Sequence, residues 1–302
     1  MAIRLKSEMK TQDDPIHGLA LTTKHRVVTY VRLILYAIQH KTSYNDLSSV
    51  MIITISPLLH FLRFKGRLPT SLGSVRIDND DVLREFIYAL FKTKFRYMPM
   101  LSSFARESSH LSTIVDVGAN VGDFTLAVSR NAGRVISIEP GRETFVTLCA
   151  NLRDNSVNNV TALNIAAHDS AETLSLDGHY LDLRVSDYQT QRHASGMPLD
   201  LVLSNQRIEH VDILKIDAQG HEAKVLKGAT GSLKAHSVDL VIVEVHPGRG
   251  VKIDDIISLM RSFDYRLSGR DNGPFQPQLY FTNSHDSTFR IPQASVMTPD
   301  LS

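Results

Sequence analysis

Two carboxylates and a pair of glycines stand where apolar segments of the sequence end, which is where a small ligand could bind. The first apolar segment contains Asp116 and runs into a turn with Gly118 and Gly122, after which a helix is expected. Glycines let the backbone approach a ligand closely, but this spacing is not the Gly-x-Gly-x-x-Gly that holds a pyrophosphate. Asp116 suits a cationic ligand group such as an ammonium, whereas it would repel a phosphate.

The second carboxylate is Glu139, which lies 23 positions after Asp116 at the end of another apolar segment. An acid at about this distance from the first strand can accept hydrogen bonds from both hydroxyls of a ribose. Together the two sites predict a nucleoside ligand with a cationic, amino-acid-like end and no phosphate. S-adenosylmethionine fits this description, whereas NAD and ATP do not. The alternative is an ordinary strand-to-helix turn flanked by two solvated acids.

The elements that must position these groups begin at Leu111, where strand-like and helix-like segments start to alternate. This alternation predicts an α/β fold with a doubly wound, mostly parallel sheet. An antiparallel hairpin is expected at its edge, from strands 265–268 and 278–281. The polar segment 179–195 is expected to be a loop or lid near the ligand. The expected strands are 113–117, 135–138, 160–165, 211–216 and 240–245, and the expected helices are 122–131, 144–155, 222–235 and 253–263.

The chain divides by charge into a basic and an acidic part. Residues 1–110 carry 16 Lys and Arg against 9 Asp and Glu, and residues 111–302 carry 17 against 23. The first part is predicted to be a mainly helical N-terminal extension that caps the site or docks the acceptor. The cofactor-binding domain is predicted at 111–283, followed by a tail at 284–302. Within the extension, helices are expected in 26–64 and 80–95 and a short strand at 74–77.

Composition also bears on the compartment. One cysteine, Cys149, cannot form an internal disulfide, and the first residues lack the apolar stretch of a signal peptide. A cytoplasmic location is therefore predicted. The apolar stretches 27–38 and 50–64 are shorter than the ~20 residues of a membrane span, but their basic flanks would allow peripheral membrane contact.

Four motifs, in this order, resemble those of FkbM-family methyltransferases. The resemblance extends from about residue 111 to 281 and implies a class I, Rossmann-like fold that uses S-adenosylmethionine. It also implies O-methylation of hydroxyls on sugars and polyketide-type natural products. One position departs from the family, because Gln219 stands where the family usually has glutamate. The motifs are DVGANVG at 116–122, IEP at 138–140, LKIDAQGHE at 214–222 and EVH at 244–246.

The resemblance also assigns cofactor-binding residues. Asp217 is implied to lie beside the sulfonium and the reacting methyl group, and the segment 166–169 is implied to lie beside the adenine. The remaining implied contacts are Asp116, Gly118, Ala119, Asn120 and Gly122 for the methionine moiety, Glu139 and Pro140 for the ribose, and Ala167 and His168 for the base.

Methyl transfer to a neutral hydroxyl requires a base, and histidine is the usual choice near pH 7. His246 and His221 are the candidates, and we favour His246 because Glu244, two positions earlier in a strand, shares its face. The expected catalytic set is therefore His246, Asp217, Glu244 and His221. His221 could instead cap its helix.

Three neighbouring groups leave further alternatives open. Glu222 could serve only to stabilise the N-terminus of the helix that His221 opens. The catalytic set together with Glu222 would also suit a divalent metal, although no metal is assigned. Lys215 and Asp217 lie on one face of their strand, which predicts either an ion pair between them or a contact of Lys215 with the substrate.

These observations predict an S-adenosylmethionine-dependent O-methyltransferase that acts on a hydroxyl of a small molecule, sugar, glycan or glycolipid. A nucleic-acid methyltransferase is the first alternative, suggested by the basic N-terminal part. The chain lacks the Asn/Asp-Pro-Pro-aromatic motif of base amino methylation and a suitably placed cysteine, so no nucleic-acid partner is expected. A non-catalytic binding protein of the same fold is the second alternative, and the acid and histidine cluster argues against it.

Overall fold

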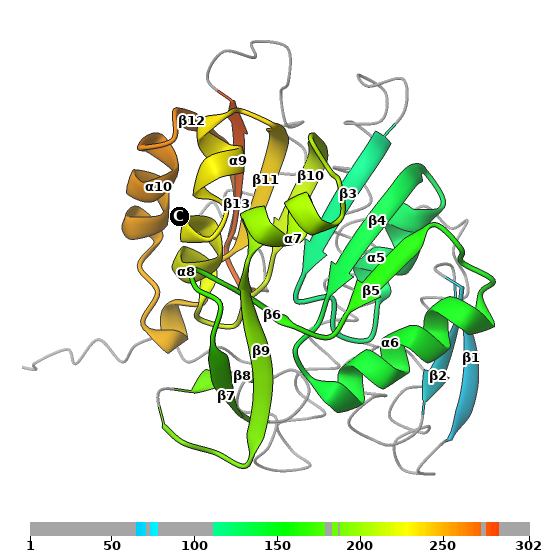
Figure 1. Ribbon diagram of the computed structural model, residues 1–302. Coiled ribbons are helices and arrows are strands. Elements are labelled where there is room, and N and C mark those ends of the chain that lie inside the picture. Colours follow the sequence, from blue (N-terminus) through cyan, green and yellow to red (C-terminus); the bar gives the residue numbers. More distant parts are fainter. Residues whose placement is uncertain are drawn as a thin grey trace, which may run out of the picture.

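A seven-stranded sheet forms the centre of the molecule (Figure 1). The computed structural model describes residues 65–70, 73–77, 111–178, 183–186, 188–272 and 276–283. Strands β11, β10, β3, β4 and β5 run parallel, whereas β13 is antiparallel to both of its neighbours, β11 and β12. The predicted edge hairpin is therefore confirmed. Across the sheet the order is β12 (Tyr265–Asp271), β13 (Gln278–Asn283), β11 (Val238–Glu244), β10 (Val211–Ile216), β3 (Leu111–Val117), β4 (Ala132–Ile138) and β5 (Val160–Leu163).

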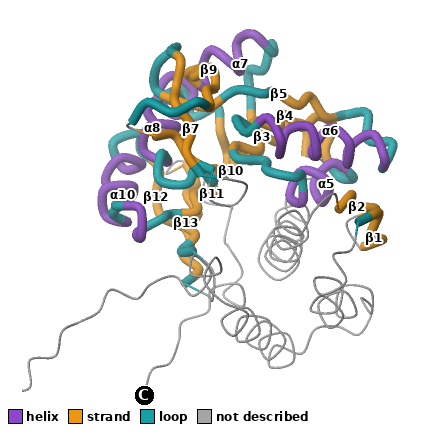
Figure 2. The backbone as a smooth tube through the Cα atoms, turned by 90° about the horizontal axis from the view of Figure 1, so that it is seen from below, coloured by secondary structure: helices purple, strands orange, loops and turns teal. Residues whose placement is uncertain are grey.

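The central strands are mostly apolar because helices cover both faces of the sheet. Every residue of β10 is buried, and the last four residues of β3 and of β4 are buried as well. Helix α5 (Asp123–Ser129) packs Phe124 and Val128 on one face, against Ile114, Val135 and their neighbours. Figure 2 shows α7 and α8 on the opposite side of the sheet from α5. The elements on that side are α7 (Leu199–Asn205), α8 (Glu222–Lys227), α9 (Thr230–Lys234) and α10 (Ile253–Arg261).

The strand order reverses at β3, which has β4 on one side and β10 on the other. In doubly wound sheets ligands bind at such a switch point, beyond the carboxyl ends of the strands. The ends of β3, β4, β10 and β11 therefore define where a site is expected, and the sequence motifs follow these four strands.

The expected helix over 222–235 is wrong, because two short helices, α8 and α9, replace it. The break falls at Gly228 and Ala229, where the chain lies directly against β6. A Cβ atom on Gly228 would stand 1.9 Å from the carbonyl oxygen of His168. The close approach of two backbones thus interrupts a segment whose side-chain spacing alone favours one helix.

A second, four-stranded sheet is an addition that sequence analysis did not foresee. The expected strand 160–165 ends at Leu163, and 179–195 is not simply a loop, because two strands begin within it. A small apolar core that includes Leu174, Leu176 and Ala194 holds this sheet together. Its order is β6 (Ala166–His168), β9 (Arg192–Pro198), β7 (Thr173–Asp177) and β8 (Arg184–Ser186).

A β-hairpin from the N-terminal part packs on helix α6 (Arg142–Asp154). Its strands are β1 (Gly66–Thr70) and β2 (Gly73–Ile77), so the expected strand at 74–77 is confirmed. The helices expected in 26–64 and 80–95, and the tail at 284–302, lie outside the described residues. Within the described residues, no helix is long and apolar enough to cross a membrane.

Asn151 links this hairpin to the domain and yields a test of the packing. Its Oδ1 accepts from Arg76 N at 2.9 Å and its Nδ2 donates to Val121 O at 2.8 Å, with the side chain fully buried. Asn151→Ala leaves both backbone groups unpaired, so we expect a loss of roughly 2–3 kcal/mol in the free energy of unfolding, measured in urea. Asn205→Ala, at the exposed end of α7, is the control, and equal unfolding of the two variants would contradict the packing described.

Candidate active site

The turn after β3 and the loop after β10 touch each other through their backbones. Asp217 N donates to Val117 O at 3.0 Å, and a Cβ atom on Gly118 would stand only 1.9 Å from Asp217 O. Gly118 also has a φ of +75°, which side chains other than glycine rarely adopt. On its other side, Gly118 N and Ala119 N both donate to Ile138 O, the last carbonyl of β4. The glycine turn is therefore fixed between two strand ends.

Asp116 is fully buried beneath this turn, and its partners belong to the protein. Its Oδ1 lies 3.0 Å from Lys215 Nζ, and its Oδ2 accepts from Thr125 Oγ1 at 2.7 Å. Lys215 also donates to Gly118 O at 3.1 Å, and it stands farther from Asp217, at 4.0 Å. The closest ion pair of Lys215 is therefore with Asp116 on the neighbouring strand β3. Asp217, which follows its own strand β10, is a more distant partner. A ligand ammonium could reach the Asp116 carboxylate only by displacing these groups.

Glu139 joins the glycine turn to the start of helix α6. Its Oε2 accepts from Asn120 N at 2.8 Å, and its Oε1 accepts from Gly141 N at 2.8 Å and Thr144 Oγ1 at 2.7 Å. Burial raises the pKa of Glu139 above its usual value, although these three donors and the charge of Lys215 act in the opposite direction. Pro140 follows at the same strand end. The carboxylate is held rigidly at the position where a ribose acceptor is expected.

His246 lies buried between two acids beyond the ends of β10 and β11. Its Nδ1 is 2.7 Å from Glu222 Oε1, and its Nε2 is 3.6 Å from Asp217 Oδ1. Glu244, at the end of β11, accepts from Gln278 Nε2 at 3.1 Å on the adjacent strand β13. The structure therefore brings together three of the four predicted catalytic residues, His246, Asp217 and Glu244.

The surroundings of His246 favour its protonated form. Burial alone would lower the pKa of His246. The hydrogen bond to Glu222 and the negative charges of Glu222, Asp217 and Glu244 raise it, and together they outweigh the effect of burial. The pKa of His246 is consequently raised above its ordinary value. A histidine of this kind is a stronger base than a free imidazole once it has lost its proton.

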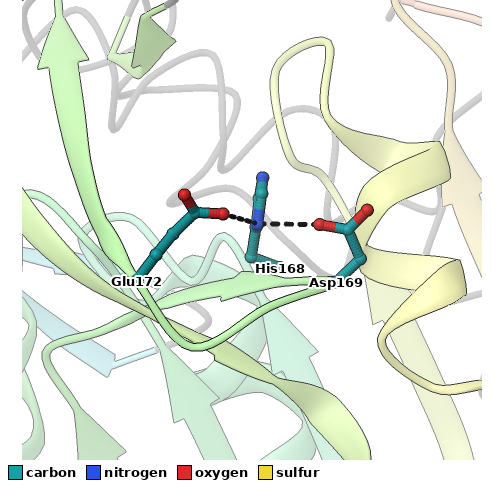
Figure 3. A group of neighbouring side chains, drawn as sticks. All are labelled: His168, Asp169 and Glu172. Carbon is teal, nitrogen blue, oxygen red and sulfur yellow. Dashed lines mark ion pairs between the residues drawn. The ribbon is translucent and has the colours of Figure 1, made fainter.

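The ring of His221 lies near the ring of His168. The two ring centroids are 6.0 Å apart, which joins the predicted adenine segment of β6 to the loop that precedes α8. Figure 3 shows His168 Nδ1 facing Asp169 Oδ1 at 3.0 Å and Glu172 Oε1 at 3.5 Å. Lys224 binds the other oxygen of Asp169 at 2.9 Å. Ala167, beside His168 in β6, is buried.

Within the described residues, three clusters have the spacing to bridge a divalent cation, with ligand atoms within 4.8 Å of one another. Protein partners already bind members of the His168 cluster and of the His246 cluster: Lys224 binds Asp169, Gln219 Nε2 donates to Asp217 Oδ1 at 3.1 Å, and Gln278 donates to Glu244. We therefore describe these groups by their hydrogen bonds and ion pairs. The clusters are His168, Asp169 and Glu172; His210, Asp212 and Asp239; and Asp217, Glu244 and His246.

Several groups that complete the site were not predicted to do so. Thr125, Thr144 and Gln278 each hold a predicted carboxylate, and each lies on a different element. The sequence could have indicated only Thr125 and Thr144, because each lies in the first turn of a helix that directly follows a motif. Gln278 reaches Glu244 through strand pairing, which local sequence does not reveal.

The strand order, the glycine turn after β3, the acid after β4 and the acid and histidine cluster after β10 and β11 define a class I methyltransferase. The methyltransferase FkbM domain family matches residues 116–267, which is half of the chain. The chain belongs to this family and is a methyltransferase.

Two curated relatives and one solved structure illustrate the similarity. The hexuronic acid methyltransferase AglP of Haloferax volcanii is 29% identical over 183 residues, 55% of this chain and 74% of AglP. The methyltransferase sdnD of Sordaria araneosa is 24% identical over 242 residues, 66% of this chain and 92% of sdnD. The structure of a methyltransferase FkbM from Methylobacillus flagellatus is 18% identical with a TM-score of 0.45, covering 85% of this chain and 60% of that chain.

Gly118→Ala tests the backbone contact that fixes the turn. We expect the free energy of unfolding to fall by roughly 2–4 kcal/mol, because the methyl group would meet Asp217 O and the positive φ disfavours alanine. The matched control is Gly248→Ala, where the added atom meets nothing within 4 Å. Denaturant unfolding measures both, and similar midpoints for the two variants would refute the contact.

Proposed function

We propose that this methyltransferase takes its methyl group from S-adenosylmethionine and transfers it to a hydroxyl of a sugar, glycan, glycolipid or other small molecule. The observation that carries the proposal is the buried His246, whose Nε2 faces Asp217 beyond the glycine turn. AglP, named for a hexuronic acid, supports a sugar-like acceptor. Asp116 and Glu139, together with a glycine turn that lacks the pyrophosphate-binding spacing, support S-adenosylmethionine as the methyl donor.

The proposed cofactor contacts follow the strand ends. The methionine moiety would lie against the turn of Gly118, Ala119, Asn120 and Gly122, with Asp116 supporting that turn from below through Lys215. The ribose would lie at Glu139 and Pro140, and the adenine beside Ala167 and His168. Asp217 would lie beside the sulfonium and the reacting methyl group. When bound, S-adenosylmethionine supplies an electrophilic methyl group, and the protein's contribution is alignment and proton removal.

His246 is the proposed base. As the acceptor oxygen forms its bond to the methyl carbon, Nε2 of His246 accepts the hydroxyl proton and the bond from carbon to sulfur breaks. Glu244 and Asp217 would stabilise the imidazolium that results. His221, whose ring lies near that of His168, would lie close to the proposed adenine position. Residues 1–110 would dock the acceptor or a membrane surface, and the enzyme would act in the cytoplasm.

Glu139→Gln tests the ribose assignment. We expect the Kd for S-adenosylhomocysteine, measured by calorimetry, to rise about 10- to 100-fold, since an amide offers one acceptor oxygen in place of two charged ones. Glu143→Gln is the control, because Glu143 lies four positions later, in helix α6, with an exposed side chain. An unchanged Kd in a folded Glu139→Gln protein would remove Glu139 from the ribose site.

A panel of acceptors tests the reaction. With labelled S-adenosylmethionine, we expect methyl transfer to uronic acids, neutral sugars, their glycosides or glycolipids, and none to RNA or DNA. For an acceptor found in this way, His246→Ala should lower kcat about 100-fold or more while the Kd for S-adenosylhomocysteine changes little. His210→Ala, an exposed histidine at the opposite end of β10, is the control. Label only in nucleic acid, absence of cofactor binding, or full activity of His246→Ala would each overturn part of the proposal.

A further inference from the structure

Glu222 opens helix α8, yet its carboxylate lies inside the protein. The residue is 0% exposed, and its Oε1 accepts from both Gly220 N at 3.0 Å and the ring of His246 at 2.7 Å. A glutamate that only complements a helix N-terminus does not need to be buried, because the interaction is already favourable at an exposed position. Burial of a carboxylate is costly unless a partner compensates for it.

The second carboxylate oxygen of Glu222 argues against a purely structural role for this residue. Oε2 is buried, and within the part of the chain that the structure describes it has no hydrogen-bond partner. Buried polar atoms left in this state are uncommon in folded proteins and often accompany a functional requirement. The pairing with His246 is the feature that gives this carboxylate a use.

The contact determines which nitrogen of His246 can act as a base. An ionised carboxylate only accepts hydrogen bonds, so the 2.7 Å contact requires the hydrogen of the neutral ring to be on Nδ1. Nε2 then carries the lone pair, and it is Nε2 that faces Asp217. We propose that Glu222 is a positioning residue that fixes the orientation and tautomer of His246, so that Nε2 is the atom that accepts the acceptor's proton. This inference rests on the proposed function.

Glu222 also acts on the state that forms after proton transfer. When the hydroxyl oxygen bonds to the methyl carbon, its proton moves to Nε2 and the sulfur leaves with the electron pair of its bond to carbon. Glu222 takes no proton, but its charge stabilises the imidazolium across Nδ1.

The charged groups around His246 come from several elements. Glu222 belongs to α8, Asp217 follows β10 and Glu244 ends β11, and all three carboxylates favour the imidazolium. The neutral Gln278 of β13 binds Glu244, and Arg249, after His246, packs beside Gly220. Removal of the Glu222 charge leaves Asp217 and Glu244 in place, so the affinity of His246 for a proton should fall without being abolished.

Nuclear magnetic resonance tests the tautomer without any acceptor. In protein labelled with nitrogen-15 histidine, with His246→Ala to assign the signal, we expect neutral His246 to carry its hydrogen on Nδ1. In Glu222→Gln the pKa of His246 should fall by about one unit, and Glu222→Asp should restore part of that shift. Glu209→Gln removes an exposed charge and serves as the control. An Nε2 hydrogen in the wild type, or the same titration in Glu222→Gln, would overturn the proposal.

Kinetics with the acceptor from the panel gives the second readout. We expect Glu222→Gln to lower kcat about 10- to 100-fold at the pH optimum, with KM and the Kd for S-adenosylhomocysteine changed less than about twofold. The acid limb of the pH profile should move to lower pH, whereas a merely structural defect would lower the rate without moving the limb. If His246→Ala is fully active, the proposed base is wrong. If His246→Ala is inactive and Glu222→Gln matches the wild type in rate and pH profile, only the role of Glu222 is wrong.

Discussion

The ion pair between Asp116 and Lys215 is the interaction on which the site depends. The two residues are register partners on adjacent parallel strands, their charged atoms are 3.0 Å apart, and both are buried. A buried pair of this kind contributes little net stability compared with apolar residues, but the loss of one partner leaves an uncompensated charge. Its value is positional, because Lys215 also binds the carbonyl of Gly118 and stands 4.0 Å from Asp217. One ammonium therefore fixes the turn after β3 relative to the loop after β10.

Two clusters of polar groups meet at this point. Glu139 organises the first cluster through the amides of Asn120 and Gly141, and His246 organises the second with Glu222. The backbone contact between Gly118 and Asp217 joins them, and so does Lys215, whose charge acts on Glu139 and lies 4.0 Å from Asp217. Perturbations within one cluster should therefore couple more strongly than perturbations in different clusters, and a change at Lys215 should affect both.

The parts of the fold that could be predicted from sequence are those whose pattern is local. Strands such as β10 are mostly apolar because both faces of the sheet are covered, and the motifs fall at strand ends because parallel strands share one carboxyl edge. The predicted ion pair of Lys215 with Asp217 is only a secondary contact, because pairing with Asp116 depends on the register between strands. The sequence left Glu222 open between a helix N-terminus and a metal cluster, because nothing local reveals its contact with a residue 24 positions later.

Local sequence also does not predict where tertiary contacts break a helix or add a second sheet. Helix α8 ends at Lys227, next to Gly228, whose backbone lies against β6, and the second sheet depends on pairing between strands that polar connections separate. The acidic residues beyond Leu111 are likewise not all at the surface. Residues 111–302 carry 23 acidic residues against 17 basic ones, and four of the acids, Asp116, Glu139, Glu222 and Glu244, are buried around the strand ends. Lys215 pairs with Asp116, and His246 pairs with Glu222. Carboxylates in a poorly screened interior interact strongly with cations. The proposed donor, with a sulfonium beside its methyl group, would match the charge of these acids in sign.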